Sequence, residues 1–180
     1  MSCFISSGYT LDCRNASTGG LKDLWLLGDV NSAITGWTSN GNEQVLSASG
    51  TGTFYHFELT KQGSSFTEAI SVNTTAQSIV FEPTLVINLP RLNNTLRNIF
   101  QQLVSQQNIV GIVHDNNDRY WAFAWSNGAL VTAGAIQSGL AYNDLNGMSA
   151  LTIVGGEPDA AQEILVSTTL QAVFTGITVQ

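Results

Sequence analysis

The stretch from Ser78 to Ser126 reads SIVFEPTLVINLP (78–90), RLNNTLRNIFQQLVSQQN (91–108) and IVGIVHDNNDRYWAFAWS (109–126). It has the densest apolar patterning in the chain. Its three parts predict a long strand, a helix and a hairpin of two further strands. We find no catalytic constellation within it, so we expect this stretch to be the scaffold of the fold.

The first part alternates between two faces, as a strand does. The residues that share its apolar face are Ile79, Phe81, Leu85, Ile87 and Leu89. Pro83 cannot donate a hydrogen bond to a neighbouring strand, so we expect a bulge or an unpaired stretch there. Pro90 ends the strand.

The second part has helical spacing, with Asn93 as a good N-cap residue. Its apolar stripe consists of Leu92, Leu96, Ile99, Phe100 and Leu103. The stripe is narrow, which predicts a helix at about residues 94–107 that docks on a sheet through one face.

The third part predicts strands at Ile109–His114 and Arg119–Trp125, joined by an Asp-Asn-Asn-Asp turn of residues that tolerate positive φ. Trp121, Phe123 and Trp125 fall on one face of the second strand. We expect that face to be core.

Outside this stretch the chain predicts short strands and turns. The shorter strands are expected at Leu21–Leu27, Thr53–Thr60, Phe66–Val72, Leu130–Thr132, Met148–Val154, Ile164–Thr168, Leu170–Phe174 and Ile177–Val179. The turn Lys61–Ser64 has hairpin length, so we expect Thr53–Thr60 and Phe66–Val72 to pair. Residues 31–52 are rich in Ser, Thr, Asn and Gly and predict one or two weak strands around a loop at Thr38–Asn42.

The sum predicts an α+β, mostly β fold: an antiparallel β-sandwich or barrel with one flanking helix, extended arms and loops. We expect an N-terminal arm at residues 1–20 and a single β-rich domain at residues 21–180. We see no internal repeat.

The composition limits the function classes. Charged residues make up 11% of the chain, less than half of the usual share of about 25%, which favours a surface that is buried against partners. The net charge is −7, which argues against a nucleic-acid-binding face, because such a face needs clustered Lys and Arg. No signal peptide and no membrane span is visible. Cys3 and Cys13 are too few for a secreted disulfide scaffold, so we expect an intracellular origin with either two buried thiols or one bridge.

Candidate sites are weak. His56 and His114 lack a local nucleophile motif that would indicate a Ser-His-Asp triad. His114, Asp115 and Asp118 could bind a metal, although a hairpin turn already explains both aspartates. We therefore predict no catalytic residue, no cofactor site, no metal site and no enzymatic activity.

Aromatic residues leave two alternatives open. Trp37 is either a core anchor of a hairpin or a contact to a neighbouring subunit. Arg119, Tyr120 and Trp121 could stack on bases or sugars, but the surrounding charge is acidic and the alternation favours core.

Four segments together resemble a known family. They read SGYTLDCRNASTGGLKDLWLL, FTEAISVNTTAQSIVFEPTLVINLPRLNNTLRNIFQQL, VGIVHDNNDRYWAFAWSNGALVTAG and SGLAYNDLNGMSALTIVGGEP. In this order and spacing they resemble tail-tube-like or connector-ring virion structural proteins of tailed bacteriophages, of the type found in phages of Bacteroidetes. The resemblance covers most of residues 6–158, and residues 159–180 are outside it.

The resemblance implies a phage tail tube subunit. Such proteins assemble into rings, usually hexameric, that stack into a DNA conduit, and the acidic balance of this chain suits a lumen that repels phosphate. The expected partners are copies of the chain itself, other tail or neck proteins, and genomic DNA that passes without specific binding. The expected location is the virion tail, after assembly in the host bacterial cytoplasm. The alternatives are a head–tail connector, neck or baseplate ring of the same fold, and a carbohydrate- or protein-binding β-sandwich module.

The resemblance also implies where contacts lie. We expect the N-terminal arm Met1–Gly20, the loop Thr35–Gly52 and the loop Ala133–Gly147 to make contacts within and between rings, and sheet edges to pair across subunits. The alternative is that these segments are ordinary surface loops.

Overall fold

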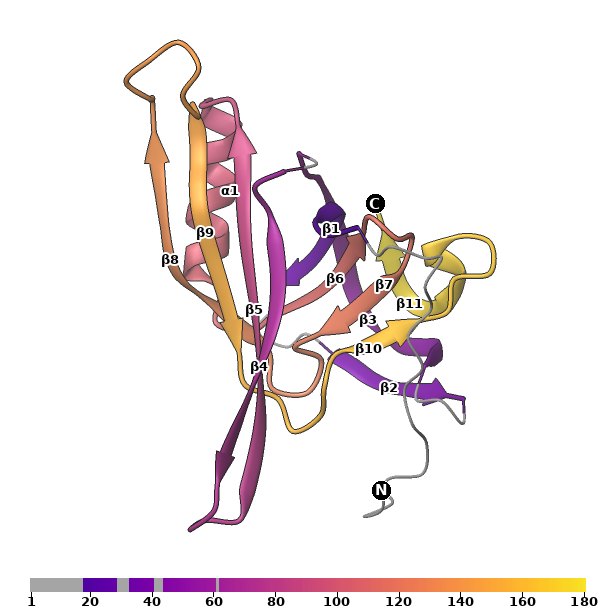
Figure 1. Ribbon diagram of the computed structural model, residues 1–180. Coiled ribbons are helices and arrows are strands. Elements are labelled where there is room, and N and C mark those ends of the chain that lie inside the picture. The colour runs from indigo at the N-terminus through magenta and orange to yellow at the C-terminus, as the bar shows by residue number, and fades with distance from the viewer. Residues whose placement is uncertain (1–17, 29–32, 41–43, 61) are drawn as a thin grey trace.

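The computed structural model describes residues 18–28, 33–40, 44–60 and 62–180 of the chain (Figure 1). Cys3, Cys13 and most of the expected N-terminal arm lie outside these residues, as do residues 41–42 of the expected loop Thr38–Asn42. The described part is mostly β, with one α-helix.

Eleven strands, one α-helix and one 3-10 helix make up the described fold. They are β1 (Leu21–Gly28), β2 (Ala33–Ser39), β3 (Val45–Glu58), β4 (Ser65–Asn73), β5 (Ser78–Pro90), α1 (Asn94–Ser105), β6 (Ile109–Asp115), β7 (Tyr120–Phe123), β8 (Ala129–Gln137), β9 (Gly147–Gly155), β10 (Gln162–Ile164), η1 (Leu170–Val173) and β11 (Phe174–Val179). The predicted fold class, α+β and mostly β with a flanking helix, is confirmed.

The strands form one sheet in the order β1-β3-β10-β7-β6-β8-β9-β5-β4. Because β1 also pairs with β6, the five strands β1, β3, β10, β7 and β6 close into a small barrel. The other four strands of this order, β8-β9-β5-β4, extend from it as an antiparallel sheet that we call the wing. Strands β2 and β11 lie off this order, and both pair with β3. Barrel and wing are joined at β8, whose pairing with β6 is recorded at Ile109↔Ala129.

The sheet is mixed, whereas the sequence predicted an antiparallel one. Strand β3 runs parallel to both β10 and β11. It has room for these partners because it is 14 residues long and pairs with β1 at one end and β2 at the other.

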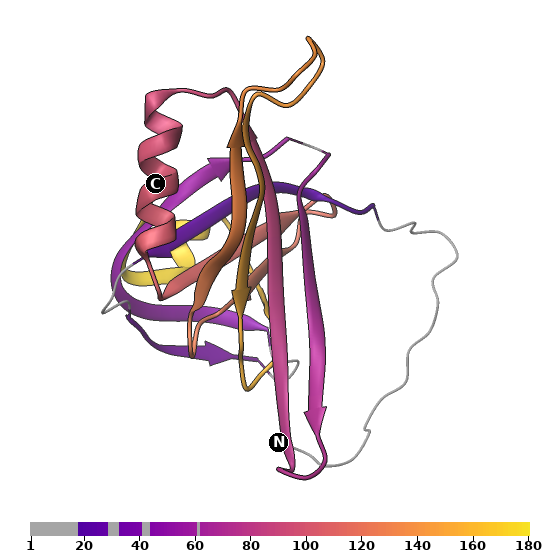
Figure 2. The same cartoon turned by 90° about the vertical axis from the view of Figure 1, so that its left-hand side faces the viewer.

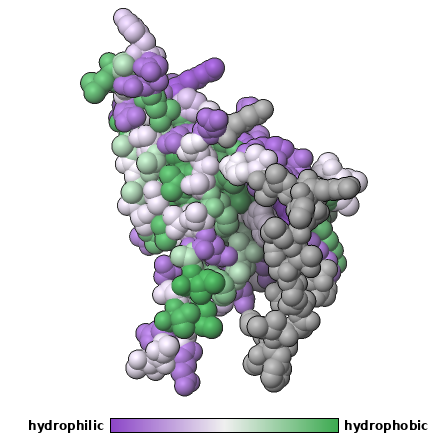
Figure 3. Space-filling model, in the orientation of Figure 1, coloured by the Kyte–Doolittle hydropathy of each residue, from purple (hydrophilic) through white to green (hydrophobic). Residues whose placement is uncertain are grey.

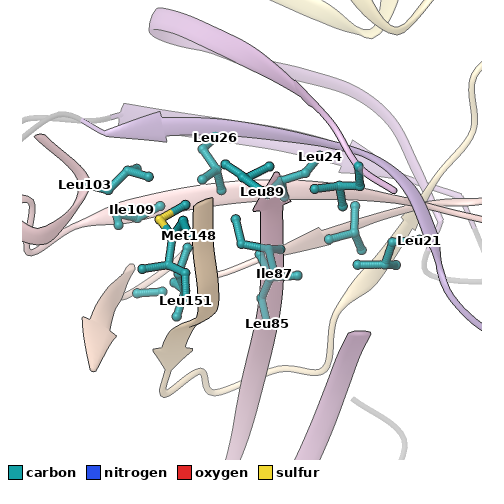
Figure 4. Close-up of a cluster of buried hydrophobic side chains, with 14 of the residues drawn as sticks. Leu21, Leu24, Leu26, Leu85, Ile87, Leu89, Leu103, Ile109, Met148 and Leu151 are labelled. Atoms are coloured by element: carbon teal, nitrogen blue, oxygen red, sulfur yellow. The ribbon is translucent and has the colours of Figure 1, made fainter. Parts of the chain in front are cut away.

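Two cores hold barrel and wing together. The first lies between the wing, α1 and the outer face of β1 and β6, and Figure 4 shows its side chains converging. Its labelled members are Leu21, Leu24, Leu26, Leu85, Ile87, Leu89, Leu103, Ile109, Met148 and Leu151. The second fills the barrel beneath η1 and β11 and includes Phe54, Ile112 and Phe174. Strand β6 separates the two cores, which explains why its residues from Ile109 to His114 are all buried.

The helix forms as the sequence predicted. Asn93 is its N-cap, with the side-chain Oδ1 accepting a hydrogen bond from the Leu96 amide at 2.7 Å. Leu96 and Leu103 are buried against the wing, while Leu92 is exposed. The helix thus covers one face of the wing and leaves the other face open (Figure 2).

Several boundaries and pairings differ from the prediction. Thr53–Thr60 does not pair with Phe66–Val72, because β3 finds its partners in the barrel and β4 pairs with β5. Thr35–Gly52, expected as a contact loop, is largely two paired strands whose Ser and Thr side chains bond across the pair, as Thr38 and Ser47 do at 2.7 Å. Leu170–Phe174 begins with a 3-10 turn instead of a strand.

The long strand behaves as its sequence predicted at the proline. Pro83 pairs with Glu68 of β4 in unbroken register, but the recorded pairing of β5 with β9 stops at Thr84. Beyond the proline, Phe81 is bridged to Glu157. The ladder is therefore interrupted on the side where the proline lacks a donor.

Candidate assembly surfaces

The wing has one open face, opposite the core and α1. Its cross-strand pairs there are Ser65↔Val86, Thr67↔Thr84, Ala69↔Glu82, Val86↔Thr152 and Thr84↔Val154. Half of these eight side chains are Ser or Thr, and three of the others are Ala or Val. Glu82 is exposed and is the only charged member of these pairs, and the sequences of β4, β5, β8 and β9 contain no Lys or Arg.

The wing also has two open edges. Strand β4 forms one edge and pairs with β5 through nine consecutive residue pairs without a register shift. Strand β8 forms the other edge, beyond its single recorded pair with β6. Since β8, β9, β5 and β4 alternate in direction, the two edge strands run in opposite directions.

The β4–β5 hairpin reaches past the body of the molecule (Figures 1 and 2). On its core-side face, Ile70 pairs with Phe81 and Val72 with Ile79. The exposed fractions of Ile70, Val72 and Ile79 are 64%, 60% and 57%. Figure 3 shows green side chains gathered on this projecting end. We call these four residues the hairpin patch, an apolar surface that continues the core beyond the barrel that covers it.

The β8–β9 connection projects at the opposite end of the wing (Figure 1). Asp144 accepts hydrogen bonds from the amides of Leu140 and Ala141 at 2.7 and 2.8 Å, and these bonds hold the pKa of Asp144 below its ordinary value. The side chains of Leu140 and Tyr142 are fully exposed. The expected contact loop Ala133–Gly147 is thus shorter than predicted, because β8 continues to Gln137.

The two histidines meet at one carboxylate. Asp23 of β1 binds His56 of β3 through Oδ1 at 2.9 Å and His114 of β6 through Oδ2 at 3.0 Å. Partial burial pushes the pKa of Asp23 upward, but hydrogen bonds from His114 and His56 hold it below the ordinary value. The contacts fasten β1 to both neighbours, and the ring of His114 also stacks on Tyr120 with centroids 4.3 Å apart.

The two aspartates near His114 have different roles, since Asp115 stabilises the turn and Asp118 binds Lys22 of β1. Asp115 accepts hydrogen bonds from the amides of Asn117 and Arg119 at 2.8 and 2.9 Å. Asp118 forms an ion pair with Lys22. Among the described residues, no set of three or more His, Cys, Asp or Glu is placed to hold a metal ion.

The described aromatic residues do not form an exposed row. Phe123 is buried and Trp121 is half-buried in the first core, as predicted for that face. Trp125 was expected on the same face but packs in the second core, because β7 ends at Phe123 and Ala124 has φ of +59°. Trp37 packs edge-on against Trp125 with ring centroids 5.8 Å apart and keeps 37% of its surface exposed. The side chain of Arg119 lies 3.9 Å from Glu163.

The hairpin patch is the feature that sequence reasoning missed. The alternation of Phe66, Glu68, Ile70 and Val72 predicts one face of a paired strand and says nothing of what covers it. Of these four, only Phe66 and Glu68 reach the body. The ring of Phe66 packs against that of Phe123 at a tilt of 46° with centroids 5.4 Å apart, and Glu68 accepts a hydrogen bond from the Ala161 amide at 2.8 Å. The signal in the sequence that could have found it is length, because the paired apolar stretches of β4 and β5 are longer than the barrel can cover.

Comparison with known proteins adds no relative, since no family model, no curated protein and no solved structure matches the chain. Within the described ranges no helix is long and apolar enough to cross a membrane. The function must therefore be argued from the surfaces of the chain itself.

Proposed function

We propose that the chain is a virion structural protein, a tail tube subunit that assembles head to tail into rings whose stack forms a DNA conduit. The observation that carries the proposal is the wing: a four-stranded sheet with two open edges of opposite direction and one open face that is almost free of charge. Each of these properties matches a requirement of a closed ring.

Edge direction permits closure by rotation alone. When β4 of one copy lies beside β8 of the next, the two strands are antiparallel, so the alternation of the wing continues from copy to copy. A heterologous contact of this kind closes into a ring if its rotation fits, and closure removes both edges. Six copies would supply about 24 strands, more than the roughly 16–18 that leave an aqueous channel in known barrels.

The open face suits a lumen. DNA binds proteins chiefly through Lys and Arg at its phosphates, and the four wing strands carry neither. Their open face presents Thr67, Thr84 and Thr152, with Glu82 as its carboxylate. In a ring, one Glu82 from each copy would repel phosphate, so that DNA could pass without being held.

The hairpin patch suits a contact between copies. Three of its four residues keep more than half of their surface exposed in the single chain, and contiguous exposed apolar patches mark interaction sites. We assign it to the neighbouring subunit or the next ring. Together with the exposed Leu140 and Tyr142 at the other end of the wing, it gives the ring exposed apolar side chains at both rims.

The remaining roles follow from this assignment. The partners are other copies of the chain and the tail or neck proteins at the ends of the tube, and the location is the virion tail, after assembly in the host cytoplasm. A head–tail connector or baseplate ring would use the same wing closure, with one ring per virion instead of many. Neither arrangement requires a cofactor or catalysis by this chain.

Crosslinking tests the closure. Cys3 and Cys13 are replaced by Ser, and Thr67→Cys on β4 is combined with Thr132→Cys on β8. Within one chain these strands are separated by β5 and β9, a span of about 14 Å at about 4.8 Å per strand, so a disulfide cannot join them. We expect oxidation to give a ladder of covalent multimers.

The matched control keeps Thr67→Cys and moves the second cysteine to Gln101 on α1, which lies on the covered side of the wing. The control should give no ladder. An equal ladder in the control, or a ladder in neither variant, would contradict closure through β4 and β8.

A further inference from the structure

The barrel has its own open edge, at β11. This strand pairs in parallel with β3, and no other described strand pairs with its second side. Gln180, which follows β11, donates to Phe54 O at 2.9 Å and accepts from His56 N at 3.0 Å, so its main chain points at β3. Because main-chain groups alternate along a strand, those of Ile177 and Val179 point to the open side.

The side chain of Gln171 bonds to two of these outward main-chain groups, the carbonyl of Ile177 and the amide of Val179. Gln171 donates from Nε2 to the Ile177 carbonyl at 2.8 Å and accepts at Oε1 from the Val179 amide at 2.6 Å. A residue of a parallel neighbour strand would bond to the same two groups, the carbonyl of one residue and the amide of the residue two further on. The side-chain amide of Gln171 thus stands in for the peptide of an added strand.

The position of Gln171 is fixed by the turn that carries it. Its neighbours in η1, Leu170 and Val173, are buried over the second core with 8% and 4% of their surfaces exposed. Burial of these two residues holds the amide beside β11 and lowers the entropy that its two hydrogen bonds would otherwise cost.

A second device acts on the same edge. The register of β11 shifts between Thr175 and Ile177, where Gly176 has φ of +79°. Bulges of this kind twist an edge away from a partner. Strand β4 shows no register shift with β5 and, among the described residues, no side-chain amide bonded along its outer edge, whereas β8 shifts register with β9 between Val131 and Ala133 and between Ala133 and Ala135. The bulge alone therefore does not distinguish β11 from the wing edges, and the distinction depends on Gln171.

We propose that Gln171 is a plug that closes the β11 edge against strand addition and so restricts pairing between copies to the wing. The blocked occupant is a strand of a second copy. The plug rests on the proposed function in one respect, namely that copies assemble through the edges of the wing. The occupancy of β11 itself does not depend on it.

The test compares β11 with and without the plug. Gln171→Met keeps the length of the side chain but removes both hydrogen bonds. It is introduced with Thr178→Cys, an exposed reporter on β11, in the background without Cys3 and Cys13, and the protein is treated with a short bis-maleimide crosslinker. We expect crosslinked dimers to increase about tenfold over the same reporter with Gln171, since two hydrogen bonds no longer compete with an incoming strand.

The first control is Gln101→Met, the same chemical change at an exposed position of α1, with the same reporter; crosslinking should stay at the level of the parent. The second control is a reporter on the wing edge, Ser71→Cys, which should crosslink to the same extent whether or not the Gln171→Met change is present. If Gln171→Met leaves crosslinking at Thr178→Cys unchanged, the plug is refuted.

The two proposals fail separately. A protein that never forms rings but gains crosslinks at Thr178→Cys in Gln171→Met would retain the plug and lose the tail tube function. A protein that forms rings but shows unchanged crosslinking at Thr178→Cys in Gln171→Met would retain the tail tube function and lose the plug. A melting temperature for each variant shows that the compared proteins are folded.

Discussion

Replacing the apolar side chains of the hairpin patch should abolish assembly and leave the single chain folded. The variant is Ile70→Thr with Val72→Thr and Ile79→Thr, because Thr keeps the β-branched shape that strands favour while making the surface polar. Between 57% and 64% of each side chain is still exposed and thus available for burial by a neighbour. Full burial of such a side chain contributes about 1.5–3 kcal/mol, so the exposed part of each is worth about 1–2 kcal/mol.

The three changes together should therefore weaken association by at most about 3–6 kcal/mol, a factor of about 10² to 10⁴ in the association constant. Sedimentation velocity over a concentration series would measure the shift. Urea unfolding of the dissociated chain should change by no more than about 0.5 kcal/mol, as is usual at exposed positions. The control is Val104→Thr on α1, where 48% of the side chain is exposed. If the triple variant assembled at the same protein concentration as the wild type, the role of the patch would be refuted.

Three further predictions concern the fold. Because the folded-state pKa of Asp23 is lowered, its contribution to stability is present above the unfolded pKa of about 4 and is lost as pH falls through the folded value. The free energy of urea unfolding should therefore fall less between about pH 5 and pH 2 in Asp23→Asn than in the wild type. Equal falls in the two proteins would contradict this role of Asp23. Gly111→Ala should lower the free energy of urea unfolding by about 1–3 kcal/mol, because an added Cβ would lie 2.2 Å from Phe123 Cζ. Adding Phe123→Leu to the same chain should recover part of that stability. An unchanged stability of Gly111→Ala would show that the Phe123 ring moves freely. Asn93→Ala should cost about 1 kcal/mol through loss of the helix cap, and Asn93→Asp should cost less; equal costs would argue against the cap.

Periodicity predicted the local elements well. The stripe from Leu92 to Leu103 and the cap at Asn93 predicted the helix, although Leu92 itself lies before the helix and is exposed. The turn Asp115–Asp118 predicted the β6–β7 hairpin. Both signals act over a few residues. The missing donor of Pro83 predicted the interruption of the ladder for the same reason.

Pairing between distant strands was less predictable. The turn Lys61–Ser64 has hairpin length, yet β3 and β4 do not pair across it, because β3 has better partners in β1 and β11. The meeting of Asp23, His56 and His114 depends on three strands that are adjacent only in the folded sheet. Local propensity carries no information about such choices.

The candidate surfaces also depend on what lies over them. Alternation placed Ile70 and Val72 on an apolar face, but only the three-dimensional extent of the barrel shows that this face is uncovered. Likewise, the sequence around Gln171 predicted a strand, and the hydrogen bonds of its side chain emerge only with β11 in place.

The central claim is that copies of this chain close into a ring around a channel. Negative-stain electron microscopy of the purified protein, over a series of rising concentrations, tests it most directly. We expect rings or stacked tubes with a central channel. A uniform population of single 19.2 kDa chains at the highest concentration would contradict the claim and would favour a monomeric binding module.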